Sequence, residues 1–302
     1  MKFNHILLPL LIVAALVSSC QSDEDPNYEP NGYEKISYYK IISFNVRYSS
    51  ATEIDGDNRW ELRRDASVKM VAKHKPLVMG LQEACPDQID FLDLNLTGYK
   101  HIGVGRDDGK RAGEMMAIYY DTTRLTLLDS GTFWLSETPE KVSIGWDAAC
   151  NRTCTWGHFK MKDTDFEFLY FNTHLDHVGS LARKNSIKLI AAKMTELNPD
   201  NVPVFLSGDF NSTTDDPIFD PLKASLKDAR MMSAISDKNI TYNGFGKVTD
   251  NPDSRKEWVI DHIFFSGVNP LAFRVLNCNF GVPFISDHYP ISFKFSTQTE
   301  EQ

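Results

Sequence analysis

An apolar run in the second half of the chain ends in side chains that could do chemistry. Residues 204–208 read Val-Phe-Leu-Ser-Gly, and Asp209 and Asn211 follow. A buried strand ending here would place these two side chains on the same side of the backbone, because residues two apart on an extended chain share a face. Asp and Asn also favour ordinary turns, so this motif alone fits a turn that closes a core strand equally well.

Other apolar runs end in the same way, and their polar residues form a chemically coherent set. Carboxylate and carboxamide oxygens with few thiols favour Mg²⁺ or Mn²⁺, with Ca²⁺ as a further candidate, over a structural zinc ion. A divalent ion beside histidines suits phosphate ester hydrolysis, because both neutralise charge on phosphoryl oxygens while a carboxylate orients or deprotonates the attacking water. The set consists of Asn45, Glu83, His174, Asp176, Asp209, Asn211, Asp261, His262, Asp287 and His288.

The elements that must position these residues are strands mixed with helices. Helices are expected from Arg59 to just before Pro76, at 87–95, and after Gly179. We expect residues 99–133 to form a meander and residues 153–172 to form a hairpin. With no repeat and no internal boundary, this pattern indicates a single α/β sandwich domain. Strands are predicted at 37–44, 77–81, 99–105, 115–120, 125–133, 153–161, 166–172, 204–209, 258–265 and 291–295.

Six short motifs at these strand ends occur in a familiar order. They are Ser43-Phe44-Asn45, Leu81-Gln82-Glu83, Asn172-Thr173-His174, Gly208-Asp209-Phe210-Asn211, Ile260-Asp261-His262-Ile263 and Ser286-Asp287-His288-Tyr289-Pro290. Together they resemble the endonuclease/exonuclease/phosphatase superfamily, which includes pancreatic-type deoxyribonuclease, deadenylases, neutral sphingomyelinases and inositol-polyphosphate phosphatases. The resemblance spans residues 36–295. It implies a four-layered α/β/β/α sandwich, with two mixed, mainly antiparallel sheets flanked by helices and an active site at one edge between them.

The resemblance also implies roles for individual residues. Glu83 would be the principal metal ligand with Asn45 beside it, and Asp287 would bind the metal or orient His288. Mg²⁺ would be the resident ion, with Mn²⁺ or Ca²⁺ as alternatives.

The catalytic roles follow in the same way. Asp209 would activate water, and Asn211 would hold a phosphoryl oxygen. His174 and His288 would stabilise the pentacovalent state or assist the leaving group. Asp261 would fix the tautomer of one of these two histidines, although family members differ in which one.

A second group of residues has counterparts in only part of the family or lies beside the motifs. Arg152 matches an arginine that contacts the substrate phosphate in part of the family, and Glu114 resembles an acidic residue that partners the final histidine in the nuclease branch. His262 is better explained by packing than by chemistry. Asp176 could join the site or cap the helix that follows it. Trp146 lies in a loop-like stretch and could flank the substrate.

Charge narrows the choice of substrate. The net charge is -9, and the basic residues form no Lys/Arg run, which argues against tight, sequence-independent binding of nucleic acid. We therefore expect a phosphodiesterase that is either nuclease-like, with only weak contact to nucleic acid, or acts on small or lipid phosphodiesters. Two alternatives stay open: a phosphomonoesterase for sugar or inositol phosphates, and a non-catalytic surface binding protein.

The first 32 residues predict export and anchoring. Lys2 precedes an apolar run at 6–17 that is too short to cross a bilayer and suits a signal peptide. The small residues before Cys20 resemble a lipobox, so we predict a lipoprotein signal peptide at 1–19, a lipidated Cys20, an acidic flexible tether at 20–32 and one domain at 33–302. A secretory signal with an incidental cysteine is the alternative.

The acidic run behind Cys20 resembles sorting signals of some Gram-negative lipoproteins. It predicts placement on the outer membrane, facing either the cell surface or the periplasm. We also expect the protein to be a monomer. In such an oxidising compartment Cys150 and Cys154 could form a local disulfide, which their spacing cannot establish.

Overall fold

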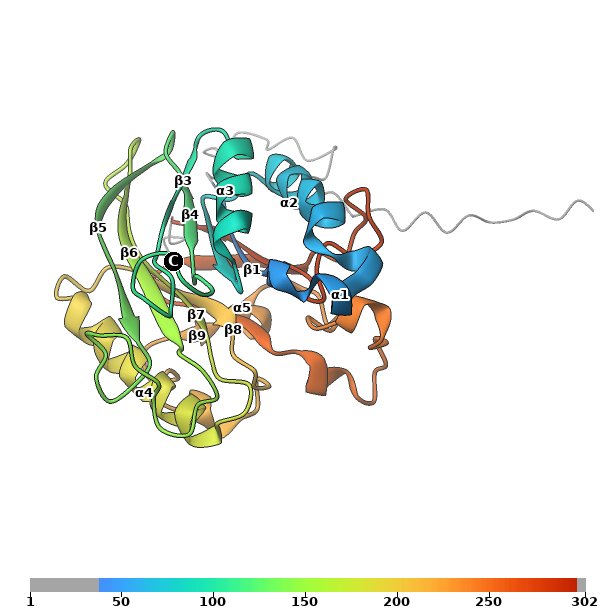
Figure 1. Cartoon of the computed structure of the whole chain (residues 1–302). Coiled ribbons are helices and arrows are strands. Elements are labelled where there is room, and N and C mark those ends of the chain that lie inside the picture. Colours follow the sequence, from blue (N-terminus) through green and yellow to red (C-terminus); the bar gives the residue numbers. More distant parts are fainter. Residues whose placement is uncertain (1–37, 298–302) are drawn as a thin grey trace, which may run out of the picture.

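Two β-sheets pack face to face, and helices cover their outer sides (Figure 1). The computed structural model describes residues 38–297. One sheet has seven strands in the order β10 (Ile235–Ser236), β12 (Asn269–Val275), β13 (Ile291–Ser296), β1 (Tyr38–Asn45), β2 (Val78–Gln82), β4 (Ile118–Asp121) and β3 (Tyr99–Ile102). The other has six, in the order β5 (Leu125–Trp134), β6 (Thr153–Met161), β7 (Glu167–His174), β8 (Val204–Asp209), β11 (Asp261–Phe265) and β9 (Lys227–Asp228).

The helices complete the four layers that the sequence predicts. They are α1 (Thr52–Asp55), α2 (Trp60–His74), α3 (Pro86–Asn95), α4 (Ser180–Leu197) and α5 (Ala229–Met232). Helices α2 and α3 pack on the seven-stranded sheet, and α4 packs on the six-stranded sheet. The predicted α/β/β/α sandwich is therefore confirmed.

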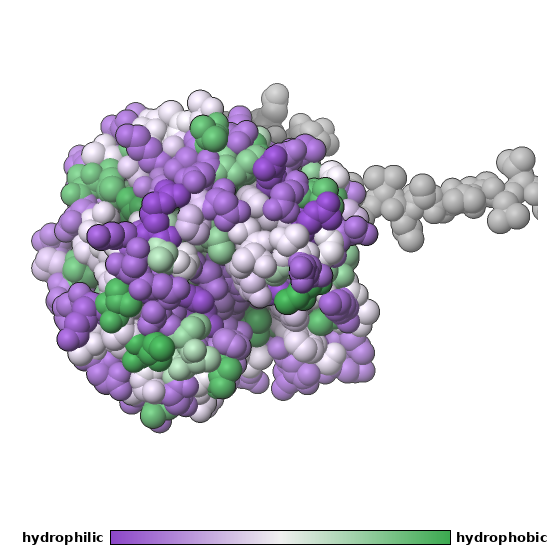
Figure 2. All heavy atoms as spheres, in the orientation of Figure 1, coloured by the Kyte–Doolittle hydropathy of each residue, from purple (hydrophilic) through white to green (hydrophobic). Residues whose placement is uncertain are grey.

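Alternation along the strands divides the core into three apolar layers. In β1, Ile41 joins the cluster between the two sheets, whereas its neighbour Ile42 joins the cluster beneath α2 and α3. In β7, Phe168 likewise faces the opposite sheet and Leu169 faces α4. Successive side chains of a strand point to opposite faces, and each fully buried large side chain contributes about 1.5–3 kcal/mol. On the face shown in Figure 2, hydrophilic residues predominate and apolar residues form small, separate patches.

A buried polar network joins the two sheets directly below the strand ends. Gln82 Nε2 donates to Asn172 Oδ1 at 2.7 Å, and Asn172 Nδ2 donates to Leu81 O at 2.7 Å. Gly80 allows this approach, because a Cβ atom on it would lie 2.6 Å from Asn172 Oδ1. Buried polar groups of this kind are costly unless they are paired, so the network fixes how the two sheets sit on each other.

The structure also corrects parts of the strand prediction. The meander over 99–133 is wrong: β3 and β4 pair, but β5 lies in the other sheet and pairs with β6. Strand β12 was not predicted, since Asn269-Pro270 at its start has the composition of a turn. The strand predicted at 258–265 begins at Asp261, so Asp261 and His262 open strand β11. The predicted hairpin of β6 and β7 is present.

Several predictions concern residues outside 38–297. The signal peptide at 1–19, the lipidated Cys20 and the tether at 20–32 all lie outside the described residues. Within the described range, no helix has both the length and the apolar character that a membrane span requires.

Candidate active site

Strand register brings the motif residues together. Strands β7 and β8 are parallel with His174 opposite Asp209, and antiparallel β11 places Asp261 on the other side of Asp209. In the facing sheet, parallel β1 and β2 place Asn45 opposite Gln82, one residue before Glu83. The carboxyl ends of parallel strands share one sheet edge, so the two sheets present their polar side chains to each other there.

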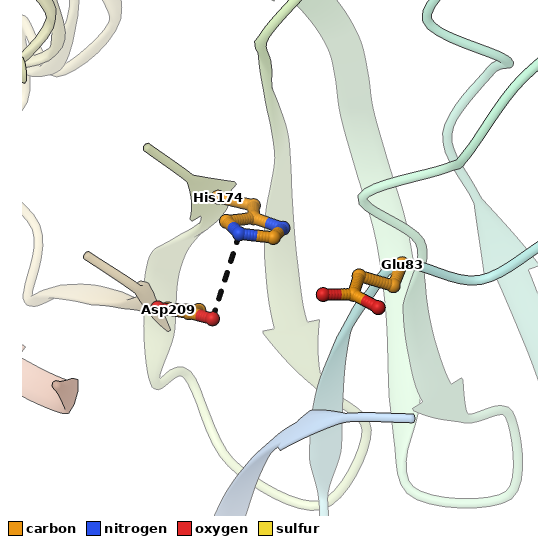
Figure 3. A group of neighbouring side chains, drawn as sticks. All are labelled: Glu83, His174 and Asp209. Carbon is orange, nitrogen blue, oxygen red and sulfur yellow. Dashed lines mark ion pairs between the residues drawn. The ribbon is translucent and has the colours of Figure 1, made fainter. Parts of the chain in front are cut away.

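Asp209 is the centre of this cluster. Its side chain is buried, and its Oδ2 lies 3.0 Å from Asn45 Nδ2, 3.5 Å from His174 Nε2 and 3.6 Å from His288 Nε2. Figure 3 shows Asp209, His174 and Glu83 pointing toward one another. Burial raises the pKa of Asp209 to about 7, aided by Asp261 and opposed by His288.

His288 carries the positive charge of the cluster. Its Nδ1 lies 2.8 Å from Asp261 Oδ2, so this structure pairs Asp261 with His288 and leaves His174 without that carboxylate. Burial lowers the pKa of His288, but Asp261 and Asp209 outweigh burial and raise it well above the ordinary value. The ring of Tyr242 packs edge-on against His288 at 5.0 Å between centroids.

His174 differs from His288 in both charge and partners. Its Nε2 lies 3.1 Å from Asn211 Nδ2, which also donates to Leu175 O at 3.0 Å. The amide nitrogen therefore faces the ring, so Nε2 accepts and the ring proton sits on Nδ1. Burial and the positive charge of Arg152 hold the pKa of His174 well below its ordinary value, so its contact with Asp209 is not an ion pair.

The residues predicted to bind a metal lie at the edge of the same cluster. Oxygen or nitrogen atoms of Glu83, His174 and Asp209 all lie within 4.8 Å of one another, and the two carboxylates suit a single cation beside the histidine. Glu83 Oε1 accepts from Asn45 Nδ2 at 3.0 Å, so Asn45 is beside Glu83 as predicted, but its nitrogen faces the carboxylates. Asn45 Oδ1 accepts from the backbone N–H of Arg47 instead.

Asp287 completes the acidic side of the site. It is buried 3.7 Å from Arg47 Nη1, and its pKa is raised by burial and by Glu83. Buried carboxylates that repel one another in this way are stabilised by a cation, and an oxygen-rich set of this kind fits Mg²⁺ or Mn²⁺.

The opposite side of the site is cationic. Arg152 Nε lies 3.3 Å from Asp176 Oδ2, and Arg152 Nη2 lies 2.9 Å from His177 Nδ1. Arg106 donates to Glu114 at 2.7 Å. The predicted contact between Glu114 and the final histidine is therefore wrong, because Asp261 is the carboxylate that contacts His288. Burial and Glu83 raise the pKa of Glu114 to about 7.

Both sides line one pocket of about 550 Å³. It contains most of the predicted site residues and several that the sequence did not single out as site residues. Its lining comprises Arg47, Tyr48, Glu83, Arg106, Glu114, Cys150, Arg152, His174, His177, Asp209, Asn211, Tyr242, Trp258, Ile260, Asp287 and His288. Asn45 and Asp261 lie behind this lining, as hydrogen-bond partners of Asp209 and His288.

The family follows from comparison with known proteins. Residues 42–288 match the Endonuclease/Exonuclease/phosphatase family. The chain belongs to this family. Its members are phosphoester hydrolases that generally use a divalent metal, so this chain is a phosphoester hydrolase.

Several solved structures of the family resemble this chain over nearly their full length. An endonuclease/exonuclease/phosphatase family protein of Bacteroides thetaiotaomicron is 37% identical, with a TM-score of 0.80, covering 88% of this chain and 100% of that one. A mannosyl-6-phosphatase of the same organism is 38% identical, with a TM-score of 0.78, covering 85% and 99%. An uncharacterized protein of Acanthamoeba polyphaga mimivirus is 27% identical, covering 85% of this chain and 99% of that protein.

The family residues that the sequence left undecided now have clear places. His262 is buried, with Nε2 2.8 Å from Ser212 O and its ring against Phe210, which agrees with packing. Cys150 and Cys154 are free thiols and are not bridged. Trp146 does not line the pocket, whereas Trp258 does.

Asp176 neither contacts the catalytic cluster nor caps α4 with its side chain. Its Oδ1 accepts the backbone N–H groups of Val178 and Gly179, while α4 receives its side-chain contacts from Asp147. Burial raises the pKa of Asp176, but the N–H donors of Gly179, Val178 and Ala149 outweigh it and hold the pKa at about 2.

Three pocket residues that the sequence did not single out stand near motifs that it did identify. Arg47 follows Asn45 by two positions, His177 follows Asp176 directly, and Trp258 precedes Asp261 by three. Closeness in sequence to a strand-end motif could have pointed to these three residues. It does not give the conformation of the loop, such as the positive φ of 59° at Arg47.

Proposed function

We propose that this phosphoester hydrolase cleaves phosphomonoesters of sugars. The observation that carries the proposal is the division of one small pocket between an acidic side and a side with Arg152 and Arg106. A pocket of about 550 Å³ has the size of a small-molecule site, and a monoester dianion presents more charge to arginines than a diester does.

Two further points support a sugar monoester over the diester expected from the sequence. The mannosyl-6-phosphatase of Bacteroides thetaiotaomicron is 38% identical and is covered over 99% of its length. The pocket wall also contains Trp258, whose ring stacks on Tyr242 at 5.7 Å. An aromatic face of this kind suits the apolar face of a sugar ring.

The proposed chemistry assigns each side of the pocket a task. Asp209 accepts the proton of the attacking water, since its buried carboxylate has a pKa near neutrality. Protonated His288, fixed by Asp261, stabilises charge that develops on the phosphoryl group. Arg152 binds a phosphoryl oxygen. The divalent ion, Mg²⁺ in this proposal, supplies further electrostatic stabilisation when bound at Glu83 with Asp209 and His174 nearby.

A direct assay tests this function. Purified protein would be given mannose 6-phosphate, glucose 6-phosphate, p-nitrophenyl phosphate and bis(p-nitrophenyl) phosphate, each with Mg²⁺ or with EDTA. We expect metal-dependent turnover of the monoesters and a kcat/KM for the diester about a hundredfold lower. Faster cleavage of the diester would replace this proposal with a phosphodiesterase, and no turnover of any ester would favour a binding protein.

We also propose the export and anchoring predicted from residues 1–32. Metabolic labelling with a radioactive fatty acid should mark the wild-type chain and not a Cys20→Ala variant. Labelling of the variant would show that Cys20 is not the lipidated residue.

A further inference from the structure

The cationic side of the pocket contains a buried charge that the protein satisfies only in part. Arg152 is 5% exposed and has three guanidinium nitrogens, each of which can donate. Nε and Nη2 have the partners described above, Asp176 and His177. Nη1 is buried and has no hydrogen-bond partner in the described part of the chain.

A second buried donor on the same pocket wall is also unsatisfied. His174 Nδ1, which carries the ring proton, has no partner among residues 38–297. An unpaired buried donor is costly, more so when the group is charged, and a native structure rarely keeps one without a purpose. Two such donors on residues that line one pocket indicate a ligand with acceptor oxygens.

The buried carboxylate of Asp176 holds Arg152 in place. Asp176 is 1% exposed, and its Oδ2 accepts the backbone N–H of Ala149 at 3.1 Å as well as Arg152 Nε. Its Oδ1 accepts two backbone N–H groups, of Val178 and Gly179. One carboxylate thereby ties Arg152 and the rest of the loop before β6 to the loop after β7.

His177 completes this arrangement from the exposed side. An arginine can only donate, so His177 Nδ1 accepts from Arg152 Nη2 in this contact. With Nε and Nη2 both occupied, the guanidinium plane cannot rotate. Nη1 is then the donor that remains for a ligand.

We propose that Asp176 and His177 are positioning residues that hold Arg152 so that its Nη1 binds a phosphoryl oxygen of the substrate. This inference rests on the proposed function for its substrate, but it concerns phosphate binding and not the identity of the ester. It gives Asp176 and His177 a task that a helix cap does not explain.

His177 offers the cleanest test, because its side chain is exposed and its replacement should leave the fold intact. The affinity of the purified protein for inorganic phosphate, with Mg²⁺ present, would be measured by isothermal titration calorimetry. In His177→Ala we expect phosphate to bind about tenfold more weakly, and the KM for p-nitrophenyl phosphate to rise more than kcat falls. His177→Gln keeps an acceptor for Arg152 and should recover most of the affinity.

Two further variants separate positioning from general damage. His158→Ala removes a partly exposed histidine that pairs with Glu167 away from the pocket, and it should bind phosphate as the wild type does. Asp176→Asn replaces one of the two accepting oxygens with an NH2 donor, so either Arg152 Nε or the backbone N–H groups of Val178 and Gly179 lose their acceptor. It should therefore lose more affinity than His177→Ala and also unfold at a lower temperature.

The outcomes distinguish this inference from the proposed function. Wild-type phosphate affinity in His177→Ala, or equal loss in the Ala and Gln variants, would overturn the positioning role even if sugar phosphates are hydrolysed. Loss in Ala with recovery in Gln would support it even if no monoester is turned over. Failure of the wild-type protein itself to bind phosphate would overturn it as well.

Discussion

The two histidines of the pocket stand in opposite electrostatic surroundings. His288 lies among Asp209, Asp261 and Asp287, which raise its pKa and keep it charged. His174 lies near Arg152 and Arg106, which together with burial lower its pKa and keep it neutral. Their Nε2 atoms are nevertheless almost equally far from Asp209 Oδ2, at 3.6 and 3.5 Å. The same side chain is thus used in two charge states on either side of one carboxylate.

This difference indicates a division of labour. The acidic half, at the ends of β2, β8 and β11, suits a cation and the activation of water. The cationic half, at the ends of β6 and β7, suits the anionic phosphoryl group. If this division is correct, substitutions in the acidic half should lower kcat, and substitutions in the cationic half should mainly raise KM.

The largest effect is expected at the carboxylate that both halves share. Asp209→Asn keeps the shape but removes the base, so kcat for the best monoester should fall by about 10³-fold or more, with little change in melting temperature. Asp129→Asn, on the exposed part of β5, serves as the matched control and should behave as wild type. A variant that retains kcat within about threefold would remove Asp209 from the chemistry.

Asp261→Asn should have the next largest effect, through His288. The amide can still accept from Nδ1 but no longer stabilises the charged ring, so the pKa of His288 should fall. We expect kcat to drop by about 10²-fold at neutral pH, and the alkaline decline of activity to move to lower pH, because the protonated ring is lost sooner. A pH profile of kcat with the wild-type alkaline limb would contradict the assigned charge state.

The acidic half was largely predictable from the sequence, and physics explains why. Its residues end apolar runs, so the pattern that predicts a buried strand also predicts where the strand ends. The order of the motifs then supplied the family and the layers. Which histidine Asp261 contacts was not predictable, since it depends on how β11 pairs with β8 and on where His288 comes in from the loop before β13.

The cationic half was harder to predict because loops build it. Arg106 lies in the segment between β3 and β4, Arg152 in the segment between β5 and β6, and His177 just after β7. Loops direct side chains in ways that periodicity does not encode. The sheet membership of β5 was missed for a related reason: its partner β6 begins nearly twenty residues after β5 ends, beyond any local pattern.

Arg152→Lys tests whether the cationic half mainly binds the substrate. Lysine keeps the charge but has one nitrogen, which cannot contact Asp176 and a phosphoryl oxygen in the same fixed geometry. KM should rise about tenfold with a smaller change in kcat. Arg111→Lys, at an exposed pair with Asp90, is the control. A loss confined to kcat would place Arg152 with the acidic half and break the proposed division.

The smallest effect on turnover is expected from a substitution in the buried polar network below the pocket, which joins the two sheets. In Gly80→Ala the new Cβ would lie 2.6 Å from Asn172 Oδ1 and 2.9 Å from Ser207 Oγ, so the sheets must shift apart slightly. We expect about 1–3 kcal/mol of lost stability in denaturant unfolding. Because β2 leads to Glu83 and β7 to His174, kcat and KM should both change by less than about fivefold. A change in only kcat or only KM would show that one half of the pocket moves independently of this network.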